Sequence, residues 1–273
     1  MNESFAIRLR QPEAGTGLTM AAPHAFVTEI AEPELHVFPA ARKKNTGIAA
    51  IICPGGGYRG LALGAEGHFC AEYLASVGIT GMVLQYRLPF GDKTIPMEDI
   101  HAAMAYARVH AEELGFSPDR LGVIGFSAGG HLAALASSLY ADDPVSTRPD
   151  FTVLFYPVTS MEKRKRGSTR LNFLGRRPSE QDVAAYSPHL RVTETTPPTL
   201  IFAADDDPQV PSRHSVLYYE ALKQNNIPAS LHIFPAGGHA WGFCDANSDG
   251  VPFRYGKTVR ELILDWMLRV TAS

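Results

Sequence analysis

The sequence predicts an α/β fold with a mostly parallel central sheet and helices on both faces. Three observations carry this prediction. Strand-like apolar runs alternate with helix-like segments along most of the chain. Several runs are apolar throughout, which is typical of strands buried on both faces of a parallel sheet. The 273 residues, of which 45% are hydrophobic, are enough to bury such a sheet in a single domain over residues 1–273.

The strands are expected as short apolar runs bounded by glycine, proline or charged residues. In chain order they are residues 25–30, 35–38, 48–53, 79–85, 121–125, 151–156, 199–203 and 230–234. The first two are separated by Pro33 and are predicted to form a hairpin at a sheet edge. Residues 1–24 are loosely patterned and are expected to be an irregular N-terminal segment.

The helices are expected where apolar residues recur at spacings of three and four. In chain order they are residues 66–77, 97–114, 128–139, 212–225 and 257–270. Parallel sheets place their sites at the carboxyl ends of the strands. Residues 159–196 are polar, basic and irregular, and we expect them to form a short cap-like insertion over such a site.

The most informative pattern lies in residues 122–131, which read Gly-Val-Ile-Gly-Phe-Ser-Ala-Gly-Gly-His. Gly125, Ser127 and Gly129 form G-x-S-x-G between a predicted strand and a predicted helix, which indicates a nucleophile elbow. A side chain two residues before or after Ser127 would collide where strand and helix approach, and glycine has none. The alternative is a glycine-rich turn whose serine caps the helix. A base and an acid elsewhere in the sequence are needed to choose between the two interpretations.

A serine hydroxyl is a weak nucleophile near neutral pH and needs a general base. Of the ten histidines, we select His239 because it follows the last predicted strand in a glycine-flanked loop. A loop there can bring an imidazole across to Ser127. His131 stands only four residues after Ser127 on the same predicted helix, and we expect it to point away from the elbow and to pack.

The acid is expected within Asp205-Asp206-Asp207, which directly follows a predicted strand. An aspartate there would accept a hydrogen bond from His239 Nδ1 and fix the tautomer of the ring. We select Asp207, which begins the pattern D-x-x-V-P, and keep Asp206 as the alternative.

An oxyanion hole is expected at Cys53-Pro-Gly-Gly-Gly-Tyr58. Consecutive glycines allow backbone N–H groups to converge, and Gly56 or Gly57 with the N–H of Ala128 would hold the oxyanion. A phosphate-binding loop is the rival interpretation, but no Gly-Lys-Ser/Thr follows. Cys53 is not expected to act as a nucleophile, because it precedes the turn and has no base nearby in sequence.

Taken together, these segments resemble the α/β-hydrolase superfamily, and more narrowly its small carboxylesterases with a P-G-G-G-Y or H-G-G-G loop. That group includes acetyl xylan esterase-like, sugar-ester hydrolases. The resemblance runs from about Pro33 to the C-terminus. Its segments are PGGGY at 54–58, YRL at 86–88, GFSAGGHLAA at 125–134, SPHL at 187–190, TPPTLIF at 196–202, DPQVP at 207–211 and GGHAWG at 237–242.

The resemblance implies an α/β-hydrolase fold and a serine carboxylesterase. It would cleave short-chain, above all acetyl, esters, such as those of acetylated xylan, through an acyl-enzyme. Tyr58, Arg87 and Trp241 are candidate pocket residues. Trp241 departs from the usual family pattern, and either narrows the pocket or simply packs. Two alternatives stay open: a serine peptidase or amidase like prolyl-oligopeptidase relatives, and a catalytically silent binding protein of the same fold.

Composition narrows the partners. A net charge of −3 favours neither nucleic acid nor an anionic membrane, and the basic run at residues 163–166 is expected to be a solvated loop. The expected partner is a small-molecule or oligosaccharide ester, and a homo-oligomer is left open. No cofactor or metal is expected. Three scattered cysteines and the lack of a signal-peptide pattern favour the cytoplasm, although a secreted protein trimmed of its leader would read the same.

Overall fold

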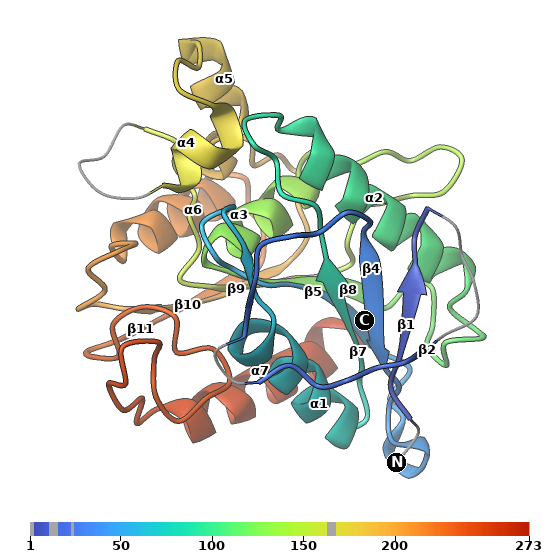
Figure 1. Cartoon of the computed structure of the whole chain (residues 1–273). Helices are drawn as coiled ribbons and strands as arrows, with labels where there is room; N and C mark the ends of the chain where they lie inside the picture. The colour runs from blue at the N-terminus through green and yellow to red at the C-terminus, as the bar shows by residue number, and fades with distance from the viewer. Residues whose placement is uncertain (1–2, 11–15, 23–24, 163–167, 273) are drawn as a thin grey trace.

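The computed structural model describes residues 3–10, 16–22, 25–162 and 168–272, and Figure 1 shows its arrangement. Nine strands form one sheet in the order β11-β10-β9-β8-β5-β7-β4-β1-β2. Their bounds are β1 Phe5–Arg8, β2 Thr16–Gly17, β4 Glu34–Phe38, β5 Ala49–Cys53, β7 Thr80–Gln85, β8 Leu121–Phe126, β9 Thr152–Phe155, β10 Thr199–Ala204 and β11 Ala229–Phe234. The run from β7 to β11 is parallel throughout, as the continuously apolar strands predicted.

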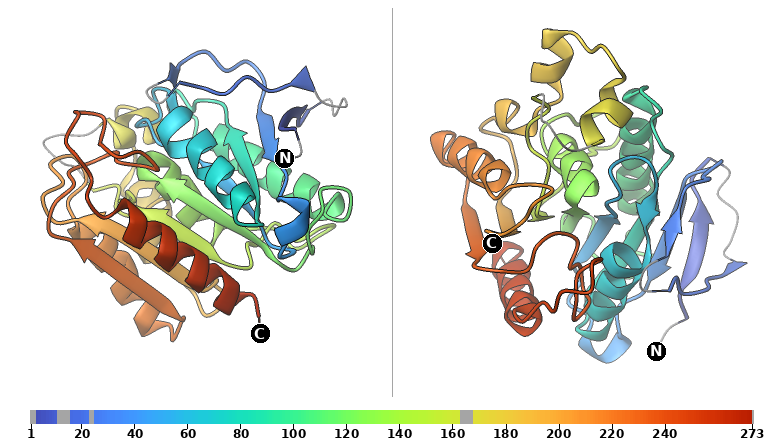
Figure 2. Two further views of the ribbon diagram at one scale, coloured as in Figure 1. Left: turned by 90° about the horizontal axis from the view of Figure 1, so that it is seen from below. Right: turned by 60° about the vertical axis from the view of Figure 1, so that its left-hand side comes forward.

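Helices cover both faces of this sheet. Figures 1 and 2 show α1 and α7 on one face and α2, α3 and α6 on the other. The helices are α1 Phe69–Ser76, α2 Thr94–Val109, α3 Ser127–Ala136, α4 Thr169–Leu174, α5 Glu180–Ala185, α6 Arg213–Gln224 and α7 Gly256–Val270. Shorter turns are the 3₁₀ segments Arg42–Lys44 and Pro188–Leu190 and the π-helix Gly64–His68. The predicted α/β-hydrolase architecture is confirmed.

The N-terminal edge corrects two expectations. Residues 25–30 do not pair with 35–38; instead β3 (Phe26–Val27) pairs with β6 (Leu61–Ala62) in a separate small sheet. The antiparallel partners of β4 are β7 and β1. The segment expected to be irregular therefore contributes β1, because the edge of β4 offers unpaired backbone groups that a strand can satisfy.

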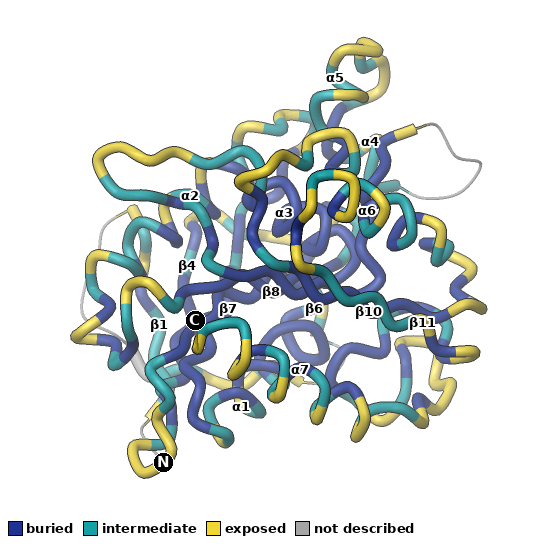
Figure 3. Tube along the Cα trace, turned by 180° about the vertical axis from the view of Figure 1, so that it is seen from behind, coloured by how far each residue is buried: buried dark blue, intermediate teal, exposed yellow. Residues whose placement is uncertain are grey.

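The core lies along the centre of the sheet. Figure 3 shows the middle strands buried and the outer turns of the helices exposed. In β5 and β8 every residue is buried. Among the described residues, no helix is both long and apolar enough to cross a membrane. The basic run at residues 163–166 lies outside the described part of the chain.

Strand register brings the ends of four strands to within two residues of one another along the sheet edge. Phe126 at the end of β8 pairs with Phe155 of β9, and Phe155 pairs with Phe202 of β10. Ala204 at the end of β10 pairs with Phe234 at the end of β11. Because parallel strands end at the same edge, the residues that follow them meet at one site.

Candidate active site

The turn from β8 into α3 holds Ser127 in a strained conformation. Its φ is +52°, in the left-handed region that non-glycine residues rarely adopt. A Cβ on Gly125 would overlap the backbone of Gly129, and one on Gly129 would overlap the carbonyl of Cys53. The predicted need for glycine on both sides of the serine is confirmed, and the turn has the shape of a nucleophile elbow.

Three side chains that follow different strands form one hydrogen-bonded chain. Ser127 Oγ lies 2.8 Å from His239 Nε2, and His239 Nδ1 lies 2.6 Å from Asp207 Oδ2. All three residues are buried. With Nδ1–H donated to the carboxylate, the free Nε2 faces the hydroxyl as an acceptor, which is the arrangement a general base needs.

The neighbouring aspartates have different partners. Asp207 Oδ1 accepts hydrogen bonds from the backbone N–H groups of Gln209 and Val210, at 2.8 and 2.9 Å. These bonds hold the carboxylate while Oδ2 faces His239. Asp206 Oδ1 instead accepts from the N–H of Gly238, at 2.7 Å. Of the two acids considered from the sequence, the structure brings Asp207 to the imidazole and uses Asp206 to hold the histidine loop.

The glycine loop after β5 lies against the elbow. Gly56 has φ +131° and Gly57 has φ +65°, so neither position suits an ordinary side chain. Both residues line a pocket together with Ser127. Ala128 lies in the first turn of α3, where backbone N–H groups have no partner within the helix. The three residues selected for the oxyanion hole therefore lie around the nucleophile.

A buried carboxylate that the sequence reading missed also reaches this place. Glu66 Oε2 accepts from the N–H of Gly55 at 3.0 Å, and Oε1 accepts from the hydroxyl of Tyr156 at 2.8 Å. Burial raises the pKa of the Glu66 carboxyl, while the nearby His239 ring and these two hydrogen bonds oppose the rise. A signal was present in the sequence, since Ala65-Glu66-Gly67 sets a carboxylate between small residues at the start of an amphipathic helix.

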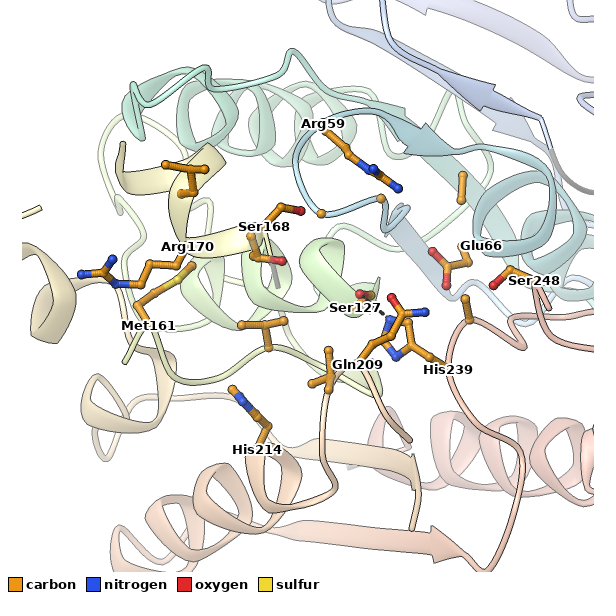
Figure 4. Close-up of a pocket in the computed structure, with 18 of the residues that line it drawn as sticks. Arg59, Glu66, Ser127, Met161, Ser168, Arg170, Gln209, His214, His239 and Ser248 are labelled. Atoms are coloured by element: carbon orange, nitrogen blue, oxygen red, sulfur yellow. Dashed lines mark hydrogen bonds between the residues drawn. The ribbon is translucent and has the colours of Figure 1, made fainter. Parts of the chain in front are cut away.

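The pocket in front of Ser127 has a volume of about 720 Å³. Figure 4 shows Ser127, Glu66 and His239 around one end of it, with Met161, Arg170 and His214 toward the other. Its lining is mixed, with charged side chains such as Arg59 and Glu162 and exposed apolar ones such as Leu171. Residues of the 159–196 segment thus contribute to the lining.

The three residues proposed for the pocket lie outside its lining. Tyr58 is buried, with its hydroxyl 2.8 Å from His131 Nδ1. Arg87 donates from Nε to Asp99 at 3.0 Å. Trp241 is fully buried and stacks on Phe253, with ring centroids 4.0 Å apart. This corrects the prediction for Tyr58 and Arg87, and for Trp241 it favours the packing alternative over a narrowed pocket.

Other candidate groups have structural partners. His131 is buried in α3, and burial lowers its pKa to about 4. Its Nε2 lies 2.8 Å from the carbonyl of Tyr186. Burial raises the pKa of the Cys53 thiol, which disfavours the thiolate. Among the described residues, no cluster of histidine, cysteine or acidic side chains has the arrangement of a metal site.

Comparisons with known proteins show which family the chain belongs to. The family model BD-FAE matches residues 35–222. An acetylxylan esterase from Xylanibacter ruminicola is 35% identical over 83% of this chain, and an endo-1,4-beta-xylanase B from Butyrivibrio fibrisolvens is 29% identical over 73%. The chain spans only 46% and 33% of these two proteins.

Solved structures extend the likeness over nearly the whole chain. An acetyl ester-xyloside bifunctional hydrolase from Caldicellulosiruptor lactoaceticus superposes with a TM-score of 0.79 at 32% identity, covering 94% of this chain and 99% of that one. The native esterase 2 of Thermogutta terrifontis superposes with a TM-score of 0.69 at 26% identity, covering 91% and 92%. The chain therefore belongs to the BD-FAE family, and it has the α/β-hydrolase fold.

Proposed function

We propose that the chain removes acetyl and other short acyl groups from esterified carbohydrates, with Ser127 as the nucleophile. One observation carries this proposal: a continuous hydrogen-bonded chain runs from Ser127 through His239 to Asp207 and faces a pocket. Serine, imidazole and carboxylate in this order and geometry are the means by which many hydrolases activate a hydroxyl.

In the first half of the reaction, Ser127 Oγ attacks the ester carbonyl carbon while His239 Nε2 takes the hydroxyl proton. The Asp207 carboxylate stabilises the resulting imidazolium through the Nδ1–H bond. The negative charge that develops on the carbonyl oxygen is held by backbone N–H groups of the Gly56–Gly57 turn and Ala128. His239 then gives its proton to the leaving alkoxide, and the acyl group stays on Ser127.

In the second half, water replaces the alcohol. His239 takes a proton from the water, whose oxygen attacks the acyl carbonyl. The same N–H groups hold the second oxyanion, and the proton returns to Ser127 Oγ as the acid leaves.

The lining of the pocket supports a hydroxylated alcohol as the leaving group. Arg59, Glu162, Ser168 and Arg170 give it donors and acceptors, which suit sugar hydroxyls better than an aliphatic chain. The names of two relatives, an acetylxylan esterase and an acetyl ester-xyloside hydrolase, are consistent with such an alcohol. We therefore place acetylated xylo-oligosaccharides first among the substrates to be assayed.

Replacing Ser127 with alanine tests the proposal. Hydrolysis of p-nitrophenyl acetate should fall by about 10⁴-fold or more, because the nucleophile is lost. Wild-type activity should fall from the acetyl to the butyryl to the octanoyl ester, and acetate should be released from acetylated xylo-oligosaccharides. Initial rates and chromatography of the products measure both.

Ser137→Ala is the matched control, because Ser137 is a buried serine at the end of the same helix, bonded to Thr152. It should keep its activity. If Ser127→Ala also retains ordinary activity, the serine assignment is wrong. A preference for octanoyl esters would reject the substrate class.

A further inference from the structure

Among the described residues that line the pocket, Glu66 is the carboxylate that is buried and lies beside the nucleophile. A Cβ placed on Gly55 would overlap Glu66 Oε2 and would lie 2.9 Å from Ser127 Cβ. The carboxylate and the serine side chain therefore both border the space that a side chain at Gly55 would occupy. Figure 4 shows Glu66 at the same end of the cavity as Ser127 and His239.

The carboxylate links two loops that the reaction requires. One oxygen accepts from Gly55, which directly precedes the Gly56–Gly57 turn. The other accepts from Tyr156, whose hydroxyl in turn accepts from the N–H of Gly242 at 2.9 Å. Gly242 stands three residues after His239. The hydrogen-bond path Gly55–Glu66–Tyr156–Gly242 thus joins the oxyanion loop to the histidine loop.

The surrounding packing fixes this path in place. The Tyr156 ring packs on the His239 ring, with centroids 4.8 Å apart. Phe243 donates its N–H to the carbonyl of Ala65 at 3.0 Å, so the residue before Glu66 also holds the histidine loop. Glu66 itself lies in the π-helix Gly64–His68. Such single-turn insertions are frequent at functional sites, where they change the direction of a side chain.

The charge of Glu66 also acts on the base. Burial raises the pKa of the Glu66 carboxyl, whereas the nearby His239 and the hydrogen bonds that both oxygens accept favour the ionised form. A negative charge here favours the protonated imidazole that forms during each half of the reaction. The other ionisable groups around the pair are Tyr86, Tyr156, Asp207 and Cys244, together with the pocket-lining Arg59 and Asp249.

We propose that Glu66 is a positioning residue for ester hydrolysis, which holds the oxyanion loop and the histidine loop together through Tyr156 and favours protonated His239. The proposal rests on the proposed role of Ser127 and His239. This role differs from that of a carboxylate that only stabilises the fold. A positioning residue is required for turnover even in molecules that are fully folded.

The test compares Glu66→Gln, Tyr156→Phe and the double variant with wild type. Each single variant should lower kcat for p-nitrophenyl acetate by about 10–100-fold, less than loss of an oxyanion donor costs, with KM changed by less than about threefold. The double variant should cost little more than either single one, because the two residues act as a unit.

Asp99→Asn and Tyr73→Phe are the matched controls. Asp99 is a buried carboxylate that accepts from the N–H of Arg87, and Tyr73 donates to the carbonyl of Arg260. Both lie outside the lining of the pocket, so kcat should stay unchanged. Their thermal unfolding midpoints should fall, because each substitution weakens a hydrogen bond that supports the fold. If Glu66→Gln likewise lowers only the midpoint, the positioning role is overturned.

Labelling of Ser127 by a fluorophosphonate separates this proposal from the choice of ester. Labelling requires the nucleophile, the base and the oxyanion hole but no particular substrate. Slower labelling of Glu66→Gln at an unchanged fraction of folded protein supports the positioning role even if every ester in the panel fails. Equal labelling rates in wild type and Glu66→Gln contradict it even if the ester assignment is right.

Discussion

The two ends of the pocket are built differently. At the inner end, Ser127, Asp207 and His239 are buried, and each follows a strand of the main sheet. At the outer rim, Phe26 and Leu171 line the pocket but are 44% and 48% exposed. Phe26 belongs to the two-residue strand β3, and Leu171 to the six-residue helix α4.

Under the proposed function, this difference would separate the residues that react from the residues that select the substrate. Groups that react must keep their geometry within a fraction of an ångström, so they need support from buried strands. Rim groups only contact the substrate, and short exposed elements can hold them at lower cost in strain and stability. Changes at the inner end should therefore alter kcat by orders of magnitude, whereas changes at the rim should alter KM and the ranking of substrates.

The largest expected effect separates two adjacent aspartates. Asp207→Asn should lower kcat by about 10⁴-fold, because the amide cannot fix the Nδ1–H tautomer of His239 or stabilise its protonated form. Asp206→Asn keeps an oxygen that can accept from Gly238 and should cost less than about tenfold. Steady-state kinetics with p-nitrophenyl acetate measure both, and equal mild losses would break the assignment of Asp207.

Much of the inner end is predictable because its residues are constrained by local rules. Gly125 and Gly129 are required by the close approach of strand and helix. His239 follows the last strand, so its place in the sequence alone predicts that it lies at the carboxyl edge of the sheet. The choice between Asp206 and Asp207 stayed open in the sequence, because both follow the same strand. Only the fold shows that one carboxylate faces the imidazole and the other faces the backbone of Gly238.

The rest depends on contacts between distant segments. Trp241 and Tyr58 are aromatic residues next to active-site loops, yet whether such a side chain enters the pocket or packs behind it depends on what fills the space behind. For Trp241 that space is filled by Phe253. Glu66 was overlooked for the same reason, since its partners Gly55 and Tyr156 are 11 and 90 residues away in sequence. Propensity and periodicity carry no information about such pairs.

The second expected effect concerns stability at acidic pH. It tests His131, which lies in the helix that begins at Ser127. His131 connects α3 to Tyr58 and to the carbonyl of Tyr186, and burial lowers its pKa to about 4 from an ordinary 6.5. The unfolded chain takes up this proton more readily, so the free energy of unfolding should fall as the pH drops from about 6.5 to about 4. His131 alone accounts for about 3 kcal/mol of that fall. Urea unfolding across this range measures it.

His131→Gln should reduce this pH dependence, because the titrating group is gone. Tyr58→Phe is the matched control: it removes the hydroxyl bonded to His131 but no group that titrates in this range. It should cost about 1 kcal/mol at neutral pH and leave a clear fall in acid. A His131→Gln variant with an unchanged pH dependence would show that other groups, such as His68 with its pKa of about 4, account for the fall.

The smallest expected effect lies at the rim. Phe26 faces the pocket beside the oxyanion loop, with the Arg59 guanidinium 5.7 Å from its ring centroid. An exposed ring beside a cation gives a flat apolar surface with polar groups next to it, which suits the apolar face of a sugar. Phe26→Ala should raise KM for acetylated xylo-oligosaccharides by about fivefold, since loss of one such contact costs about 1 kcal/mol. The effect on KM for p-nitrophenyl acetate should be smaller than about twofold.

Comparing the two substrates distinguishes loss of a sugar contact from damage to the oxyanion loop. Phe26 also packs on Gly60, so its loss could loosen the loop that carries Gly56 and Gly57. A loosened loop would lower kcat for both substrates, whereas loss of a sugar contact raises KM for one. Phe26→Leu, which keeps apolar bulk against Gly60 but removes the ring, should reproduce the change in KM. If Phe26→Leu has wild-type KM, or if the Phe26 variants lower kcat equally for both substrates, Phe26 supports the loop that carries Gly56 and Gly57 and does not select the alcohol.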